Sequence, residues 1–398
     1  MTTHHDFVII GGGNAGISVA ARLLRSGERD IAVIEPSLTH YYQPLWTLVG
    51  GGRARAEHSA RAQSQFMPAG ARWYRSWANA VDPESQKISL TDGTELSYRV
   101  LIVCPGIQLD WDQIPGLSET LGLDGVSSNY SYDLAPQTWE FIRELQSGTA
   151  VFAMPSGPIK CAGAPQKIAY MAADYWRSQS RQNDIRVVLV LPTPAMFGVP
   201  VYAKELKRVA DGYGIEVRLS SEVVEVDSAN REVIVKDLVA DTKERLEYDM
   251  MHIAPPQSAP DWIKASPLAD PNDPRGYVEV NRHTLVHSRF PNIIALGDAG
   301  STPNSKTGAA IRKQAPVAVA NAKLALAEKA PNAFYSGYAS CPLVTSRNRM
   351  LLAEFDYTME PTPSIPFVDL TKERRDMWYL KKYGLPALYW HAILRGRA

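Results

Sequence analysis

Several features are scarce in this 398-residue chain, and each scarcity argues against a class of protein. The three cysteines, Cys104, Cys161 and Cys341, are too few for a disulfide framework, and no two have the CxxC spacing of a zinc site or a thioredoxin motif. Basic and acidic residues number 42 each, so the chain lacks the positive excess expected of a nucleic-acid-binding protein. It also lacks an uninterrupted run of about 18 apolar residues, which argues against a membrane-spanning helix.

We expect no targeting segment at the start of this chain. The first strand is predicted to begin by Phe7, and no basic region, apolar run and small-residue cleavage site precede it. We therefore expect a protein made and kept on the cytoplasmic side of a membrane, or a mature form that is already trimmed. The length allows two domains and a short appendage.

A glycine-rich turn near the start predicts a dinucleotide site. The stretch DFVIIGGGNAGISVAARLLRSG is typical of a buried strand, a turn and a helix, with Gly11, Gly13 and Gly16 in GxGxxG spacing. The second glycine lets the backbone approach a pyrophosphate, and the third lets helix and strand pack closely. The helix start offers free N–H groups to the phosphates. The next strand, DIAVIEP, ends at Glu35, whose carboxylate can accept hydrogen bonds from a ribose hydroxyl.

A second segment, late in the chain, favours FAD over NAD at this site. FPNIIALGDAG is predicted to be a strand that ends in Gly297 and Asp298, and KTGAAIRKQAPVAVANAKLALAEK follows as an amphipathic helix. In flavoproteins with two dinucleotide-type domains, the aspartate of such a strand hydrogen-bonds the ribityl chain. The start of the following helix stabilises negative charge on the reduced flavin.

We predict an α/β fold of two nested Rossmann-like domains and a C-terminal membrane-associating segment. The FAD domain covers 1–113 and 286–330, the second domain covers 114–285, and 331–398 form the C-terminal redox-cysteine and membrane region. The second domain has predicted strands GTAVFAMP, DIRVVLVLP and DMMHIAPP and a meander, EVVEVDSANREVIVKD. No GxGxxG follows the first of these strands, and no ribose-binding acid ends the second. We therefore expect no NADH site in this domain.

The cysteines differ in their surroundings. Cys161 lies just before a predicted helix, APQKIAYMAADYW, with Lys160 and Lys167 beside it. Helix starts and ammonium groups can lower a cysteine pKa from about 8.5 to ~3.5–7.5, so this thiol is placed to be a thiolate, although a buried structural role stays open. Cys341 forms a redox pair with Cys161 only if the chain brings the two together, which their spacing cannot show. Cys104 is interpreted as a core residue.

Five stretches resemble one family. They are HYYQPLWTLVGGG (His40–Gly52), SNYSYDLAPQTWEFI (Ser128–Ile142), KCAGAPQKIAYM (Lys160–Met171), SCPLVTSRNRMLLAEFDY (Ser340–Tyr357) and LYWHAILRG (Leu388–Gly396). With the flavin motifs they span nearly the whole chain. The chain resembles the sulfide:quinone oxidoreductases, most closely the type that includes the mitochondrial enzymes.

The resemblance implies an enzyme, its cofactor and its partners. Hydrogen sulfide, as hydrosulfide, attacks a bridge between Cys161 and Cys341 and leaves a persulfide on Cys341, while the Cys161 sulfur passes two electrons to FAD. A sulfur acceptor (glutathione, sulfite or another sulfide) removes the sulfur, and ubiquinone or menaquinone reoxidises the flavin. Whether the protein forms a homodimer stays open. Lys167 is expected to draw in hydrosulfide and steady the thiolates. The expected FAD contacts are Gly11, Gly13, Gly16, Glu35, Gln43, Gly297, Asp298, Lys306 and Thr307.

One departure from the family pattern concerns a third cysteine that some bacterial members carry just after the crossover. The comparable stretch is GVSSNYSYD, which has none, so we favour a two-cysteine mechanism.

The C-terminal stretch MWYLKKYGLPALYWHAILRGRA predicts a membrane contact. Its aromatic, apolar and basic residues are typical of an element that lies in the membrane interface, and we expect Gly384 and Pro386 to break it into two short pieces. Lys381 and Lys382 could lie near the quinone head. The alternative is a tail packed on the protein's own body or on a dimer partner. We expect a peripheral protein of a bacterial inner membrane, or of the mitochondrial one.

Three other functions are alternatives to that of a sulfide:quinone oxidoreductase. An NADH:quinone reductase of the same architecture should have the second glycine loop, which is missing. A periplasmic flavoprotein with a cytochrome partner should have a signal peptide and no aromatic, basic tail. A non-catalytic FAD-binding or redox-signalling protein would need neither paired cysteines nor a membrane tail.

Overall fold

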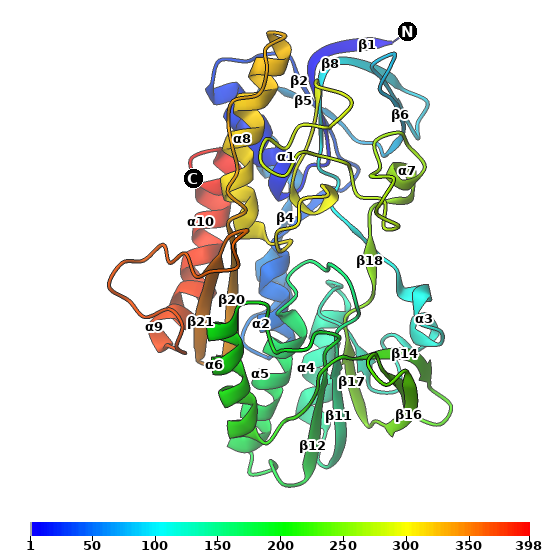
Figure 1. The fold of residues 1–398 in the computed structure, drawn as a ribbon, viewed down its shortest axis with the longest axis vertical. Helices are drawn as coiled ribbons and strands as arrows, with labels where there is room; N and C mark the ends of the chain where they lie inside the picture. The colour runs from blue at the N-terminus through cyan, green and yellow to red at the C-terminus, as the bar shows by residue number, and fades with distance from the viewer. Residues whose placement is uncertain (1) are drawn as a thin grey trace.

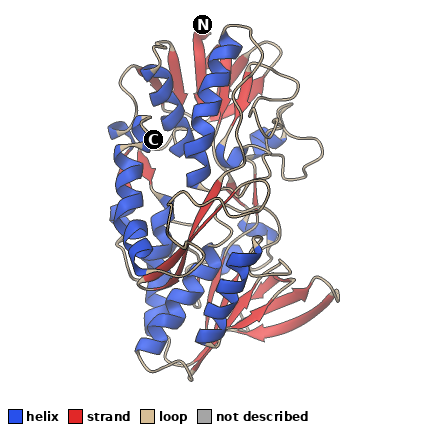
Figure 2. Cartoon of the chain, turned by 60° about the vertical axis from the view of Figure 1, so that its left-hand side comes forward, coloured by secondary structure: helices blue, strands red, loops and turns tan. Residues whose placement is uncertain are grey.

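The computed structural model describes residues 2–398, arranged as two sheet-based parts, one above the other in Figure 1. Strands of the first part lie at the top with helices α1 (Asn14–Arg25) and α8 (Gly308–Leu326), and those of the second part lie below. Figure 2 shows the helices packed on both sheets from another side. None of the helices within residues 2–398 is long and apolar enough to cross a membrane.

The upper sheet has seven strands in the order β5-β2-β1-β8-β7-β6, with β19 paired to β8. The pairs among β5, β2, β1, β8 and β19 are parallel, whereas β6 and β7 join as an antiparallel meander. Because β19 follows the whole second part of the chain, the first domain is interrupted and then resumed. The strands are β1 (Thr3–Ile10), β2 (Ile31–Ile34), β5 (Ala71–Tyr74), β6 (Ala78–Asp82), β7 (Lys87–Leu90), β8 (Glu95–Val103) and β19 (Ile293–Ala295).

The lower sheet is parallel, with the order β10-β17-β11-β12-β13, and a three-stranded antiparallel meander lies beside it. The strands are β10 (Val126–Ser127), β11 (Gly148–Ala153), β12 (Ile185–Val190), β13 (Glu216–Arg218) and β17 (Met250–Ile253), and the meander is β14 (Ser221–Asp227), β15 (Glu232–Asp237) and β16 (Thr242–Glu247). The helices are α4 (Leu134–Glu144), α5 (Ala164–Ser178) and α6 (Pro200–Tyr213). Most of the predicted strands and helices of this part therefore lie close to their expected positions.

Two extended segments connect the parts, where β9 (Gln108–Leu109) pairs with β18 (Gln257–Ser258). Beyond β18, Ala259, Ile263 and Leu268 already pack in the core of the upper sheet. The predicted domain limits stay a prediction, and this packing favours a return to the first domain near residue 258, earlier than 286.

A hairpin and a helical tail complete the chain. Strands β20 (Ala339–Ser346) and β21 (Arg349–Phe355) pair antiparallel, and β20 packs against α5. The tail runs through α9 (Arg375–Tyr379), a π-helical turn (Leu380–Gly384) and α10 (Leu385–His391) without interruption.

The expected break at Gly384 and Pro386 was therefore wrong. Gly384 has a helical φ of −68°, and Pro386 lies in the first turn of α10, where a missing N–H group is tolerated. The π-helical turn before it accommodates the change in hydrogen bonding.

The inner side of the tail packs on the protein's own body. Six of its side chains are buried in one core with residues from the first domain: Met377, Trp378, Tyr389, Trp390, Ile393 and Leu394. Tyr379 and Tyr383 are exposed. Much of the apolar surface expected to meet a membrane is thus used inside the fold.

Candidate functional site

The glycine turn after β1 leaves room for a phosphate. A Cβ atom at Gly11, where φ is +104°, would overlap the carbonyl of Cys104, and one at Gly16 would overlap the carbonyl of Gly11. At Gly13, by contrast, no heavy atom lies within 4 Å of such a Cβ. The start of α1 has no side-chain cap, so its first N–H groups are available to an anion. These residues fit the pyrophosphate of a dinucleotide.

Glu35 follows β2 and faces the same turn. Its carboxylate accepts hydrogen bonds from the backbone N–H groups of Gly12, at 2.7 Å, and Ser37, at 2.8 Å. Burial raises the pKa of this carboxyl, and the two backbone donors oppose the rise. The carboxylate is thus held beside the phosphate turn, where a ribose is expected.

A buried hydrogen-bond chain ties this turn to the C-terminal tail. The Gln63 amide donates to the Gly12 carbonyl at 2.7 Å, and its oxygen lies 2.8 Å from Nδ1 of His40. Nε2 of His40 lies 2.6 Å from the Tyr389 hydroxyl. Burial lowers the pKa of His40 to about 4, so the ring is neutral at pH 7, donating to Gln63 and accepting from Tyr389. Sequence reasoning missed this chain because its members lie far apart.

The late strand β19 brings Gly297 and Asp298 to the same end of the upper sheet as the glycine turn. Burial raises the pKa of Asp298, against the charges of Lys306 and Lys160. Lys306 is buried and donates to the carbonyls of Asp298, at 2.7 Å, and Gly300, at 3.0 Å. Lys306 therefore holds the turn that carries Asp298.

Thr307 caps α8. Its hydroxyl accepts a hydrogen bond from the backbone N–H of Ala310 at 3.3 Å. The start of α8 is fixed by this contact, next to the turn held by Lys306.

The structure brings Cys161 and Cys341 together, with their Sγ atoms 3.9 Å apart. Cys161 lies in the turn before α5, and Cys341 lies on β20. Nζ of Lys167, one turn into α5, lies 2.9 Å from Sγ of Cys161. Gly163 permits this approach, since a Cβ there would lie 3.1 Å from the Cys341 sulfur and overlap Leu343.

Electrostatics make the two thiols unequal. The pKa of Cys161 lies well below its usual range, first because the Cys341 thiol donates to its sulfur and then because Lys167 adds a positive charge. The pKa of Cys341 is raised for the reciprocal reason and by burial. Burial alone would lower the pKa of Lys167, but the two sulfurs raise it above its usual value. In the reduced pair, these shifts favour the thiolate at Cys161, which lies beside Lys167, and the thiol at Cys341.

The cysteine turn also contacts the segment that carries Asp298. The backbone N–H of Cys161 donates to the carbonyl of Lys306 at 2.8 Å. Lys160 reaches the other way, and its Nζ donates to the amide oxygen of Gln43 at 2.8 Å. The predicted cofactor residues and the cysteine pair thus adjoin one another.

Lys381 is a further buried lysine, and its surroundings differ from those of Lys382. Its Nζ donates to the Pro44 carbonyl at 2.7 Å, and burial, followed by the charge of Lys167, lowers its pKa to about 7. Lys382 instead lies over the rings of Trp378 and Tyr383. The π-helical turn that aims Lys381 inward had no signal in the sequence.

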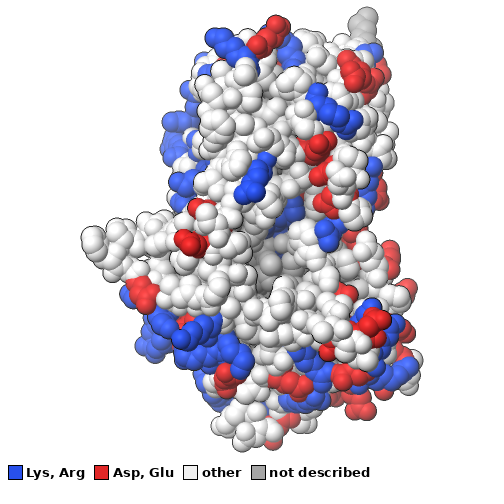
Figure 3. Space-filling view, viewed as in Figure 1, with Lys and Arg blue, Asp and Glu red and all other residues white. Residues whose placement is uncertain are grey.

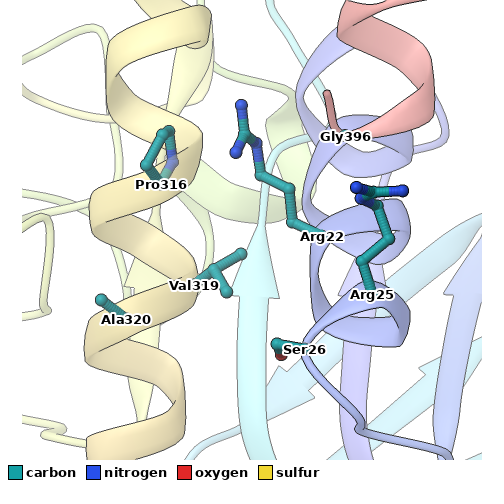
Figure 4. A pocket seen from close by; sticks show the side chains of 7 residues that line it. All are labelled: Arg22, Arg25, Ser26, Pro316, Val319, Ala320 and Gly396. Carbon is teal, nitrogen blue, oxygen red and sulfur yellow. The ribbon is translucent and has the colours of Figure 1, made fainter. Parts of the chain in front are cut away.

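The surface of the molecule has two hollows. Figure 3 shows the molecule hollowed between its upper and lower parts. A separate hollow of about 380 Å³ lies where α1, α8 and Gly396 meet, and Arg22 extends from α1 toward Pro316 (Figure 4). None of the predicted site residues lines this second hollow.

Removing the charge of Lys167 should raise the pKa of Cys161. In a Lys167→Met variant, we expect alkylation of reduced Cys161 by iodoacetamide at pH 6 to slow about tenfold or more, because an opposite charge at this distance favours the thiolate. Peptide mass spectrometry measures the rate. A Lys160→Met variant is the control, since Lys160 contacts Gln43 and not the sulfur. Equal rates in the wild-type and Lys167→Met proteins would contradict the assignment.

Comparisons with known proteins agree with this arrangement. Residues 5–322 match the family model described as pyridine nucleotide-disulphide oxidoreductase. The chain is 38% identical to the mitochondrial sulfide:quinone oxidoreductase of Mus musculus, over 99% of this chain and 87% of the mouse protein. It is 40% identical to the mitochondrial enzyme of Dictyostelium discoideum, over 98% of this chain and 86% of that protein.

Among solved structures, the sulfide:quinone oxidoreductase of Aquifex aeolicus superposes with a TM-score of 0.81 at 17% identity, covering 100% of this chain and 92% of that one. At this identity the likeness concerns the fold.

Proposed function

The chain belongs to the sulfide:quinone oxidoreductases, within the pyridine nucleotide-disulphide oxidoreductase family, and from this we propose that Cys161 and Cys341 are its sulfur-accepting centre beside FAD. The observation that carries the proposal is the 3.9 Å approach of the two sulfurs, with Lys167 at 2.9 Å. Gly11, Gly13, Gly16, Glu35 and Asp298 would hold the cofactor.

The sulfur chemistry begins from the oxidised pair. The hydrosulfide sulfur forms a bond to Cys341, the bond between the two cysteines breaks, and its electron pair leaves on Cys161 as a thiolate. Lys167 stabilises that thiolate. Because the pKa of Cys341 is raised, Cys341 is the poorer leaving group of the two and is the sulfur that hydrosulfide attacks. When bound, FAD would supply a two-electron acceptor beside Cys161, and quinone would reoxidise the reduced flavin. A sulfur acceptor takes the outer sulfur from Cys341, and the Cys161–Cys341 bond re-forms as the two cysteine sulfurs give up two electrons.

The second domain supports sulfide over NADH as the electron donor. In a nicotinamide-binding domain, the pyrophosphate lies at the helix start that follows the first strand. At the start of α5, the side chains of Cys341 and Leu343 from β20 lie against Gly163. The hairpin thus covers the position that an NADH phosphate would need.

Anaerobic mixing tests the donor. Sulfide should bleach the yellow flavin band of the purified holoprotein at once, and NADH at the same concentration should leave it unchanged. Bleaching by NADH alone would replace the proposal with the NADH:quinone reductase alternative.

We further propose peripheral attachment to an inner membrane, bacterial or mitochondrial, through a projecting loop and the outer side of the tail. The loop between β21 and α9 projects at the left of Figure 1, and its tip is uncharged in Figure 3. Phe367 in this loop is fully exposed, and Tyr379 and Tyr383 on the tail are exposed as well. Exposed aromatic residues next to lysines are typical of interfacial elements.

The loop's part in attachment can be measured by vesicle flotation. Burying a phenylalanine contributes about 1.5–3 kcal/mol, so a Phe367→Ser variant should bind vesicles of phosphatidylcholine and phosphatidylglycerol at least about tenfold more weakly. Trp77→Ser, an exposed aromatic of the first domain, is the control and should bind as the wild type does. Equal binding by the Phe367→Ser protein would exclude the loop as the contact.

A further inference from the structure

Cys161 has an unusual backbone conformation. Its φ is +55°, in the left-handed region that residues other than glycine rarely adopt, so neighbouring groups must hold it there. Two backbone contacts help: its N–H donates to the Lys306 carbonyl at 2.8 Å, and its carbonyl accepts from Ala164 at 2.8 Å. The position of its sulfur depends on this turn, because Sγ must meet both Cys341 and Lys167.

The side chain of Tyr130 reaches the backbone carbonyls of the turn. The hydroxyl of Tyr130 lies 3.0 Å from the carbonyl oxygen of Lys160 and 3.4 Å from that of Cys161. Tyr130 is 5% exposed, and its ring packs in the core formed by β11, α5 and β20. Since both contacts are to carbonyl oxygens, the phenol donates its one proton in a hydrogen bond shared between them, and burial raises the pKa of Tyr130, which keeps that proton in place.

The segment that carries Tyr130 is fixed to the lower sheet. The N–H of Asn129 donates to Nε2 of His252 on β17 at 2.9 Å, and the N–H of Tyr130 donates to Ser128 Oγ at 3.2 Å. His252 is fully buried, and burial lowers its pKa to about 3, so it stays a neutral acceptor over the working pH range. Ser128–Tyr130 belong to the stretch that lacks the third cysteine of some bacterial relatives.

We propose that Tyr130 is a positioning residue that holds the left-handed turn at Cys161 through its hydroxyl, and so keeps the Cys161 sulfur beside Cys341 and Lys167. Without that donor, the carbonyls of Lys160 and Cys161 lose their shared partner and the turn relaxes. The sulfur then moves away from the groups that favour its thiolate. The consequence for turnover rests on the proposed function, whereas the consequence for the thiol does not.

A Tyr130→Phe variant of the FAD-loaded, reduced protein tests the proposal. We expect the iodoacetamide alkylation profile of Cys161 to shift to higher pH and flavin reduction by sulfide to slow about 10- to 100-fold, as for a small misplacement of a reacting group. Tyr170→Phe is the matched control. Tyr170 is buried in the same core, but its hydroxyl donates to Gln166 and Leu206 and makes no hydrogen bond to the turn at Cys161. It should change neither readout.

Two unnatural residues separate positioning from packing, also if Tyr130→Phe folds poorly. At position 130, 4-aminophenylalanine keeps a donor and should restore the wild-type profile, whereas 4-fluorophenylalanine keeps the bulk without the donor and should not. A wild-type alkylation profile with 4-fluorophenylalanine would overturn the proposal, as would a lower melting temperature with no change in the profile. If Tyr130→Phe shifts the profile but sulfide does not reduce even the wild-type flavin, the proposed function is refuted and the role of Tyr130 is intact.

Discussion

A Cys341→Ser protein should stay folded and yellow, and sulfide should reduce its flavin at least about 10³-fold more slowly than in the wild type. The serine oxygen cannot form the sulfur–sulfur bond that captures hydrosulfide, and loss of a nucleophilic or bond-forming partner typically has effects of this size. Cys161→Ser should be equally impaired, because no thiolate remains beside Lys167. Stopped-flow absorbance of the flavin band measures both rates.

The control for this experiment is the third cysteine. Cys104 is buried at the end of β8, and its sulfur makes only a weak contact with the Gly11 carbonyl, at 3.8 Å. A Cys104→Ser variant should therefore be reduced at a rate close to that of the wild type. If Cys341→Ser and Cys104→Ser were reduced equally fast, the cysteine pair would not be the sulfur-accepting centre.

The second large effect concerns the glycine turn. Gly16→Ala should abolish FAD retention and lower the yield of folded protein, because the added methyl group overlaps the Gly11 carbonyl in the tight contact between β1 and α1. Gly13→Ala has open space around the new methyl group, so the apoprotein should fold normally. We expect it nevertheless to bind FAD at least about tenfold more weakly, since the methyl group enters the space of the pyrophosphate.

Comparing the two variants distinguishes folding from cofactor binding. Circular dichroism follows the fold, and the ratio of flavin to protein absorbance follows FAD retention. A Gly13→Ala protein that retains FAD as the wild type does would place the pyrophosphate away from this turn.

The parts of the fold predicted from sequence are those with local signals. The glycine spacing, the Gly-Asp turn after β19 and the helix after Cys161 depend on residues that are close together in the chain, so their patterns could be read directly. The tail shows the limit of such patterns. Pro386 predicts a break in isolation, but the π-helical turn before it and packing on the first domain keep the helix continuous.

The site itself depended on tertiary contacts. The approach of Cys341 to Cys161 follows from the packing of β20 on α5, which no spacing specifies, and only the family resemblance predicted it. The contacts that Lys381, His40 and Tyr130 make had no signal in the sequence, because the partner groups lie on other elements of the fold. Lys306 and Thr307 were predicted as cofactor contacts, and their bonds in the structure hold the turn and helix start around that position.

Sulfur mapping of the wild-type protein tests the central claim most directly. After anaerobic treatment with one equivalent of sulfide and alkylation, mass spectrometry should find one additional sulfur atom on the peptide with Cys341 and an alkylated Cys161 without additional sulfur. An additional sulfur on Cys161 alone, or on neither cysteine while the flavin is bleached, would contradict this account.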